Sequence, residues 1–343
     1  MCAFFYTMKP TLYILLVPIF LVSCGSKNPQ GYEPDVLFSA PEYFGAPAYS
    51  NDANTPTVDR FELGRKLFYD PILSADSTQS CASCHRQHAG FSDPGVAISP
   101  GISGTTPGPR NAPALANLAW FPNYMMDGGI TNLEVMPFAP ITSAHEMNAD
   151  MATVVSAVQQ RADYRAAFNR AFDEDTVTSQ RIFYALAIFQ SGMISANSRW
   201  DQRERGELVF SDVELWGEGL FVENCASCHP APFFTDWTYV NVGLDSITDP
   251  GRYLVSQDSA DYGAFKVPSL RNVVLSPPYF HDGRAATLEQ AVNHFTAFEG
   301  GGGMDQRLLD MRELDKDEKL ALLSFLHTLT DYSYTTNPLF EKP

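Results

Sequence analysis

Two short motifs carry the chemistry that this chain can be expected to perform. Residues 81–85 read Cys-Ala-Ser-Cys-His, and the same five residues return at 225–229. Two thiols three positions apart, followed at once by a histidine, are what covalent attachment of a c-type haem requires, because each sulfur adds to one vinyl group and the imidazole becomes the proximal iron ligand. The predicted haem ligands are Cys81, Cys84 and His85 in the first motif and Cys225, Cys228 and His229 in the second.

Paired cysteines of this kind also fit two other sites. The four thiols would make a four-thiolate zinc site. In an oxidising compartment they would instead suit two structural disulfides. Neither alternative uses the histidine that follows each pair, so the sequence favours haem over both.

The N-terminus has the features of an export signal. Residues 11–22 form an apolar run preceded by Lys9, too short for a membrane span, which needs about 20 apolar residues. The run ends in Leu-Val-Ser-Cys24, which resembles a bacterial lipobox. We therefore expect residues 1–23 to be removed and Cys24 to be lipidated, giving a periplasmic lipoprotein that meets the membrane through its anchor alone. An ordinary cleaved signal that leaves Cys24 as a stray thiol is the alternative.

The chain is strongly acidic. It has 23 Lys and Arg against 40 Asp and Glu, a net charge of -17, and removing residues 1–23 takes away one lysine and leaves -18. Such a surface repels nucleic acid and attracts basic partners, so we expect a small electron donor such as a basic cytochrome c. The alternative is that the charge provides only solubility.

Amphipathic helices are expected to position the two motifs. The first should start near Thr57, and Asp150 and Thr178 can cap the next ones, with apolar residues at helical spacing over 150–172 and 178–195. The chain closes with an expected helix over 314–329. Its predicted apolar face is Leu320, Leu323, Leu326 and Leu329.

The regions around the two motifs resemble each other. Residues 64–68 recur as 217–221 ahead of the second motif, and residues 113–134 match 268–289 without a gap over 22 residues. We infer two copies of one haem-binding unit. The expected fold is mainly α, with long Pro/Gly-rich loops, a tether at 24–56, and two cytochrome-c-like haem domains at 57–200 and 201–336.

Taken together, these motifs resemble those of the bacterial di-haem cytochrome c peroxidases and their MauG-like relatives. The resemblance covers about 57–331. Besides the haem motifs, it rests on 110–113, 127–128, 145–147, 265–272 and 278–283. It implies that the N-terminal haem reduces hydrogen peroxide and that the C-terminal haem relays electrons to it. A MauG-like oxidase of a protein or small molecule and a non-enzymatic electron carrier are the alternatives.

The resemblance also assigns roles near the first haem. Glu146 matches the acid that moves a proton during peroxide cleavage. His88 is too close to His85 to reach the opposite face of the ring and is expected at the surface or in contact with a haem propionate. No histidine lies between His88 and His145, so we expect an uncapped iron and a high-spin component in the oxidised protein. Two departures weaken the match: Met126 replaces the usual tryptophan between the haems, and Met136 replaces a glutamine beside the acid.

The second haem and a calcium site are less well specified. Phe295 stands where the family supplies a sixth iron ligand, and His294 and Met304 are the candidates to replace it. The remaining alternative is that the second haem is also five-coordinate. The family's calcium, held by an asparagine and by backbone carbonyls, would lie at Asn111, Ser276 and Pro278. The alternative is that Asn111 only caps a turn. The family is often dimeric, so a homodimer is also considered.

Overall fold

The computed structural model describes residues 37–102, 104–244, 248–296, 304–309 and 311–343. These residues belong to one unit of internal contacts, 32–343. The predicted lipidation site, Cys24, lies outside the described residues. Within the described part of the chain, no helix is long and apolar enough to cross a membrane.

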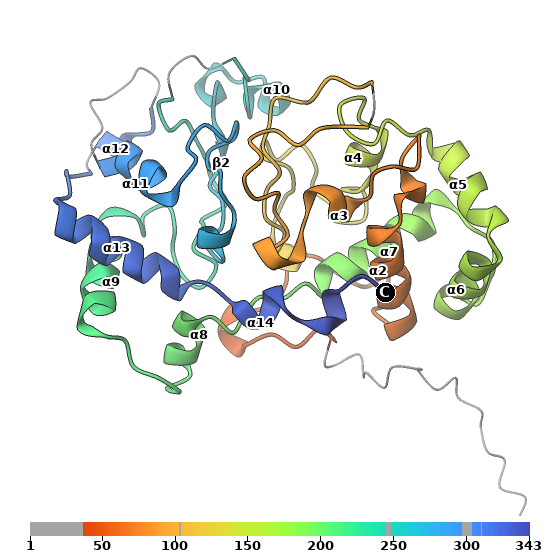
Figure 1. Ribbon diagram of the computed structural model, residues 1–343, viewed down its shortest axis with the longest axis horizontal. Coiled ribbons are helices and arrows are strands. Elements are labelled where there is room, and N and C mark those ends of the chain that lie inside the picture. Colours follow the sequence, from red (N-terminus) through yellow and green to blue (C-terminus); the bar gives the residue numbers. More distant parts are fainter. Residues whose placement is uncertain (1–36, 103, 245–247, 297–303, 310) are drawn as a thin grey trace, which may run out of the picture. The chain divides into compact units, whose positions relative to one another are not determined.

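Helices dominate the described backbone, which confirms a mainly α fold (Figure 1). The α-helices are α2 Val58–Tyr69, α3 Cys81–Cys84, α4 Phe138–Thr142, α5 Met151–Gln160, α6 Ala162–Phe172, α7 Ser179–Ser191, α8 Arg199–Glu204, α9 Asp212–Asn224, α10 Tyr253–Ser256, α11 Leu288–Thr296, α12 Gln306–Leu309, α13 Lys316–Thr328 and α14 Tyr332–Thr335. Strands β1, Tyr239–Val240, and β2, Phe265–Lys266, pair antiparallel with Tyr239 opposite Lys266. Long irregular segments connect the helices and carry most of the candidate site.

Two close helix pairs, α2 with α7 and α9 with α13, form the framework (Figure 1). Each pair meets at a glycine. A Cβ on Gly64 of α2 would lie 2.0 Å from the carbonyl oxygen of Ala185 in α7, and a Cβ on Gly217 of α9 would lie 2.0 Å from that of Ala321 in α13. Only glycine permits backbones to approach so closely.

Each helix pair is surrounded by an apolar core of its own. In the first core Phe61 packs against Phe189 with ring centroids 5.2 Å apart. In the second core Phe221 packs against Phe325 at 4.9 Å. A cysteine of the first motif lies at the edge of the first core and one of the second motif at the edge of the second core. The burial of these aromatic side chains therefore fixes the position of both motifs.

The predicted helix starts at Thr57, Asp150 and Thr178 are confirmed, since each side chain accepts a hydrogen bond from the backbone N–H three residues later. The pattern over 150–172 forms two helices, however. Arg161 is extended and ends α5, while the side chain of Arg165 donates to the carbonyls that this break leaves free.

The predicted apolar face of the last helix is partly wrong. Leu326 and Leu329 are buried, but Leu320 is 53% exposed, and Ala321 and Phe325 take the inner face instead. A helix turns about 100° per residue, so a spacing of three drifts by about 60° at each step. Leu320 and Leu329 consequently point in opposite directions.

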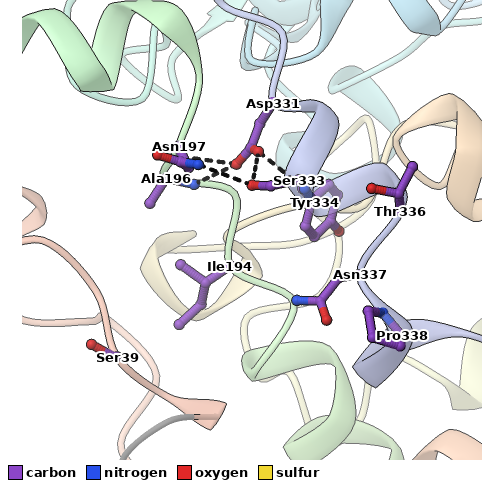
Figure 2. Close-up of a pocket in the computed structure, with 10 residues that line it drawn as sticks. All are labelled: Ser39, Ile194, Ala196, Asn197, Asp331, Ser333, Tyr334, Thr336, Asn337 and Pro338. Carbon is purple, nitrogen blue, oxygen red and sulfur yellow. Dashed lines mark hydrogen bonds between the residues drawn. The ribbon is translucent and has the colours of Figure 1, made fainter. Parts of the chain in front are cut away.

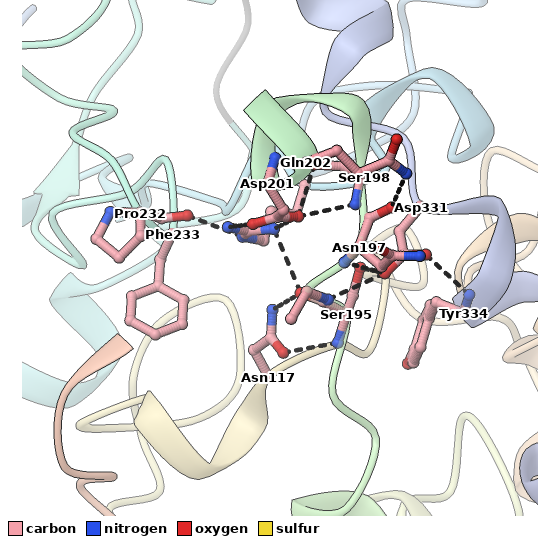
Figure 3. A network of polar contacts seen from close by, with 12 residues as sticks. Asn117, Ser195, Asn197, Ser198, Asp201, Gln202, Pro232, Phe233, Asp331 and Tyr334 are labelled. Atoms are coloured by element: carbon pink, nitrogen blue, oxygen red, sulfur yellow. Dashed lines mark hydrogen bonds and ion pairs between the residues drawn. The ribbon is translucent and has the colours of Figure 1, made fainter. Parts of the chain in front are cut away.

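A buried polar network connects the two cores (Figure 3). Asn117 and Ser195 exchange two hydrogen bonds of 3.0 and 2.8 Å, and the Ser195 hydroxyl donates to Asp331 at 3.2 Å. Nearby, Asp201 accepts two hydrogen bonds from Arg271, of 2.8 and 2.9 Å, in an ion pair that is almost fully buried. Neither group of partners is adjacent in sequence, so tertiary packing alone brings them together.

Candidate functional site

The first motif lies on the single helical turn α3. Ser80 and Ser83 cap this turn reciprocally, which fixes the backbone of both cysteines. His85 follows at the end of the turn, and its Nδ1 lies 2.9 Å from the carbonyl oxygen of Phe91. Because a carbonyl only accepts, Nδ1–H is the donor and Nε2 is left as the ligand atom.

The second motif repeats this arrangement at the end of α9. Cys225 caps that helix, and the backbone N–H of His229 donates to the carbonyl of Cys225 at 2.9 Å. The Nδ1 of His229 lies 2.8 Å from the carbonyl oxygen of Phe234. Both imidazoles are thus held in the same tautomer by a backbone carbonyl.

The two phenylalanines that supply these carbonyls adopt an unusual backbone conformation. Phe91 has φ 60° and Phe234 has φ 55°, in the left-handed region that bulky residues rarely enter. Both rings are buried, which holds the turn in place. The sequence shows the matching triplets at 91–93 and 234–236, but it gives no sign that their carbonyls orient the histidines.

Burial determines the protonation of both motifs. Burial lowers the pKa of His85 and of His229, although the backbone carbonyls that accept from each ring act in the opposite direction. Neutral imidazole is the form that binds a metal. Burial also raises the pKa of Cys81 and of Cys225 to about 12.

The residues of both motifs fit covalently attached haem. Each motif offers two free thiols beside an apolar core and one neutral imidazole with its Nε2 available. The zinc alternative does not fit, because the described residues contain no group of three or more His, Cys, Asp or Glu placed to share a metal ion. Haem attachment is the use that accounts for each histidine as well as for each pair of thiols.

Glu146 lies in the loop after α4, close to the first motif. Its backbone carbonyl accepts a hydrogen bond of 2.9 Å from Ile102, which joins this loop to the segment after the motif. The Glu146 charge acts on both Cys81 and Cys84, raising the pKa of each. Glu146 is exposed as a residue, yet burial of its carboxyl raises the pKa of Glu146, against a smaller lowering by Ser143.

The acids beside the second motif are paired instead. Asp236 and Asp305 both bind Arg307, at 2.7 and 3.0 Å. For Glu146, by contrast, the described residues supply no arginine or lysine partner. The first motif also has an arginine-paired acid, Asp93, but it has in addition one carboxylate, that of Glu146, available for proton transfer.

The segment 121–128 lies between the two motifs in sequence and packs against β1 and β2. Lys266 Nζ donates to the carbonyl oxygen of Asn123 at 2.5 Å, and Tyr239 donates to the Asn123 side chain at 2.5 Å. Met126, the replacement for the family's tryptophan, accepts a hydrogen bond from the Lys266 backbone at 2.7 Å. The ring of Trp237 contacts that of Phe121 at 6.0 Å. A tryptophan is thus present in this region, contributed by the second half of the chain.

Three comparisons with known proteins agree with this geometry. A family model described as di-haem cytochrome c peroxidase matches residues 58–209. The chain is 34% identical over 303 residues to the methylamine utilization protein MauG of Methylophilus methylotrophus, covering 86% of this chain and 88% of that protein. It is 35% identical over 286 residues to the cytochrome c551 peroxidase of Nitrosomonas europaea, covering 81% and 82%. Among solved structures, a MauG-like protein associated with microbial copper homeostasis matches with a TM-score of 0.83 and 31% identity, covering 89% of this chain and 99% of that one.

The chain belongs to the di-haem cytochrome c peroxidase and MauG family. This confirms the family and the class of enzyme predicted from the motifs, an oxidoreductase. Membership in a di-haem family also implies two c-type haems, which the two motifs fit.

This di-haem family member departs from the expected pattern at the second haem. Phe295 packs with its neighbour His294 and with Phe280, at 5.1 and 5.9 Å between ring centroids. The Nε2 of His294 lies 2.8 Å from the carbonyl oxygen of Val242, so this nitrogen is already engaged. Met304 precedes α12 beside the same segment, where the N–H of the next residue donates to Asn241. The sixth ligand stays a prediction, with His294, Met304 and a five-coordinate haem as the alternatives.

The residues predicted to hold calcium approach one loop. Asn111 Nδ2 donates to the carbonyls of Val96 and Ala97 at 3.0 and 2.9 Å. Gly95 N–H donates to the carbonyl of Pro277 at 2.9 Å, so the segment that contains Ser276 and Pro278 meets the same loop. The structure thus brings the three predicted positions close to one segment.

An ion cluster that sequence reasoning missed also joins the two halves. Arg110 binds Asp127 at 2.6 Å and the buried Asp249 at 2.7 Å. Its guanidinium lies over the ring of Phe265, which stacks at 4.0 Å on His281. Arg110 belongs to the segment 110–113 on which the family resemblance rests, but nothing in the sequence around Asp249 indicates its role.

A surface hollow lies between the segments 194–197 and 331–338 (Figure 2). It has a volume of about 470 Å³ and is lined by Ser39 and by residues of these two segments. Asp331 on its wall already accepts hydrogen bonds from Ala196, Asn197 and Ser333. None of the predicted site residues lines this hollow, and we assign it no ligand.

Proposed function

We propose that this protein is a peroxidase that reduces hydrogen peroxide to two waters with two protons and two electrons from a small redox donor. When bound, the first haem supplies an iron position open to peroxide, and the second supplies an entry point for electrons. Cys81, Cys84 and His85 would hold the first haem, and Cys225, Cys228 and His229 the second. The names of the relatives support this reaction, since one is a cytochrome c551 peroxidase.

The difference in charge between the two motifs carries the proposal. Glu146 acts on both thiols of the first motif, and among the described residues no arginine or lysine pairs with it. The other acid there, Asp93, acts on Cys84 alone and is paired with Arg86. At the second motif the acids are neutralised by Arg307. Peroxide cleavage needs a proton acceptor beside one haem only. The free carboxylate of Glu146 therefore supports assigning peroxide cleavage to the first haem.

Glu146 would move a single proton between the two oxygens of peroxide. Its carboxylate accepts the proton of the oxygen nearer the iron and returns it to the outer oxygen, which then leaves as water. A pKa raised by burial suits this role, because a carboxylate that binds its proton more tightly is the better base.

A MauG-like oxidation of an organic or protein substrate is the second candidate. Two observations favour it: the 34% identity to MauG of Methylophilus methylotrophus and the match to a MauG-like structure. Met126 and Met136 also lie where a peroxidase of this family would place a tryptophan and a glutamine. An electron carrier without enzymatic activity is the third candidate, and Glu146 is the residue that argues against it.

Several finer features belong to the same proposal. We infer an internal duplication with haem domains at 57–200 and 201–336, supported by the matching glycine contacts of Gly64 and Gly217. A basic cytochrome c is the proposed donor, supported by the net charge of -17. Cys24 is proposed as the lipid anchor of a periplasmic protein. A calcium ion at Asn111, Ser276 and Pro278 and a homodimer are proposed on the family resemblance.

Stopped-flow mixing of the reduced protein with peroxide tests this function, with Glu146→Gln as the variant and Glu174→Gln as the control. Glu174 is an exposed glutamate paired with Arg181. We expect rapid oxidation in the wild type and the control, and a loss of about 100-fold or more in Glu146→Gln. Equally slow oxidation in all three proteins would favour the electron carrier, and fewer than two haems per chain in a haemochrome assay would refute the whole assignment.

A further inference from the structure

One face of the β1–β2 pair presents polar groups to the segment 121–128. Tyr239 and Lys266 are opposite each other in the register, so their side chains share a face. Trp237 precedes the strand and reaches the same segment through the ring of Phe121. Tyr239 and Lys266 both donate to Asn123. Trp237 and Lys266 both contact the ring of Phe121. The centroid of the Trp237 ring lies 6.0 Å from the centroid of the Phe121 ring, and Lys266 Nζ lies 5.6 Å from it.

Lys266 carries a positive charge into this interface without a carboxylate to neutralise it. Its Nζ donates to the Asn123 carbonyl, and among the described residues no Asp or Glu forms an ion pair with it. Asp127 is the acid that acts on it most, but Asp127 is itself bound by Arg110 at 2.6 Å. Burial lowers the pKa of Lys266 to about 8, with Asp127 opposing and Arg252 adding to this shift. A buried ammonium in such surroundings is stabilised by any anion that reaches it.

Trp237 contributes a second donor, and this one has no acceptor among the described residues. Its Nε1 is buried, and no group in the described part of the chain accepts a hydrogen bond from it. Buried indole N–H groups normally have a partner, and an indole nitrogen only donates. Trp120 shows the ordinary case in the same protein, since its Nε1 donates to the carbonyl of Gly45 at 3.0 Å.

We propose that Lys266 Nζ and Trp237 Nε1 together bind a carboxylate, and that this carboxylate is a haem propionate. One donor is cationic and the other neutral, which suits a carboxylate better than a neutral acceptor. Trp237 follows closely after Phe234, whose carbonyl orients His229, and segment 121–128 follows Pro113, whose carbonyl acts on His85. Haem carries free carboxylates, its propionates, and the chain would hold it between these segments. This inference therefore rests on the proposed function, which assigns two haems to the chain.

The reduction potentials of the two haems test this site in the absence of peroxide, so failure here leaves the peroxidase assignment untouched. A cation beside a propionate favours the reduced iron, and removing it lowers the potential. Spectroelectrochemical titration should therefore show a lower midpoint for one haem in Lys266→Met and a smaller shift of the same haem in Trp237→Phe. Lys266→Arg should restore the wild-type value because it keeps the charge.

Trp120→Phe is the matched control, since it also removes a buried indole N–H but one that is bonded to backbone. Its two potentials should equal those of the wild type, and a haemochrome assay should confirm two haems in every variant. Unchanged potentials in both Lys266→Met and Trp237→Phe would overturn the proposal. It would also be overturned if wild-type potentials respond to added acetate and those of Lys266→Met do not, because the site would then bind a free anion.

Discussion

At Glu146 the local environment links activity to pH. Burial raises the pKa of this carboxyl above the ordinary value of about 4.3. Because the proton acceptor must be ionised, the rate of oxidation by peroxide should rise as the pH rises through this raised pKa and fall below it. Stopped-flow rates measured from pH 4 to pH 8 should show the step. If the rates of Glu146→Gln show a step with the same midpoint pH, the pH dependence belongs to another group.

The buried pair Arg271–Asp201 is a residue-scale contact on which stability depends. Burial raises the pKa of Asp201, but hydrogen bonds from Arg271 and Ser198 outweigh it, and the net pKa is lowered. The stabilisation is therefore present above the unfolded pKa of this acid and is lost as the pH falls through the folded value.

Arg271→Met should consequently destabilise the fold strongly, since it leaves Asp201 buried and uncompensated. We expect a loss of about 3–5 kcal/mol in the free energy of unfolding, measured by urea denaturation. Arg170→Met removes the exposed partner of Asp59 and is the control, with an expected effect of about 0–1 kcal/mol. Equal effects of the two substitutions would show that the buried pair is not critical.

At the scale of elements, two glycines in one helix should respond oppositely to the same change. A Cβ at Gly217 would collide with α13, whereas a Cβ at Gly219 would meet nothing within 4 Å. Gly217→Ala should lower the free energy of unfolding by about 1–3 kcal/mol or more. Gly219→Ala should raise it by about 0.5–1 kcal/mol because alanine favours the helix. Denaturant unfolding of both variants measures this difference, and destabilisation by both would contradict the close packing at Gly217.

Helix starts can be predicted from the sequence because their causes are local. The side chains of Thr57, Asp150 and Thr178 cap backbone N–H groups only three residues away. The exposure of Leu320 follows from helix geometry, since a spacing of three residues drifts around the helix. The break at Arg161 lies inside a continuous apolar pattern, so periodicity alone misses it. Spacing that looks regular in sequence becomes an apolar face only where a second helix covers it.

The candidate site divides in the same way. Both haem motifs can be predicted, because five consecutive residues contain all the ligands. The carbonyls of Phe91 and Phe234 and the contact of Arg110 with Asp249 cannot, because they arise from backbone conformation and from contacts between distant segments. Glu146 lies between these cases: the family resemblance indicates it, and its nearness to the first motif supports the proposal.

On the scale of the whole molecule, Asp331 holds together the segment that joins the two cores. Its Oδ2 accepts hydrogen bonds from Ser195, Ala196 and Asn197, at 2.9 to 3.2 Å (Figure 3). Each core packs around its own helices, and each bears one haem motif at its edge. Local opening of this segment would therefore expose backbone between the halves before either core unfolds.

Asp331→Ala should make the chain sensitive to limited proteolysis at 194–198 and release two fragments that each carry one haem. Haem-stained gels after brief digestion would show both fragments, while the wild type should remain intact under the same conditions. Asp150→Ala is the control, because it removes the cap of α5 at a distance from the joining segment. If both variants are cut at the same sites and rates, Asp331 contributes to overall stability without specifically protecting the segment 194–198. Other contacts would then join the two halves.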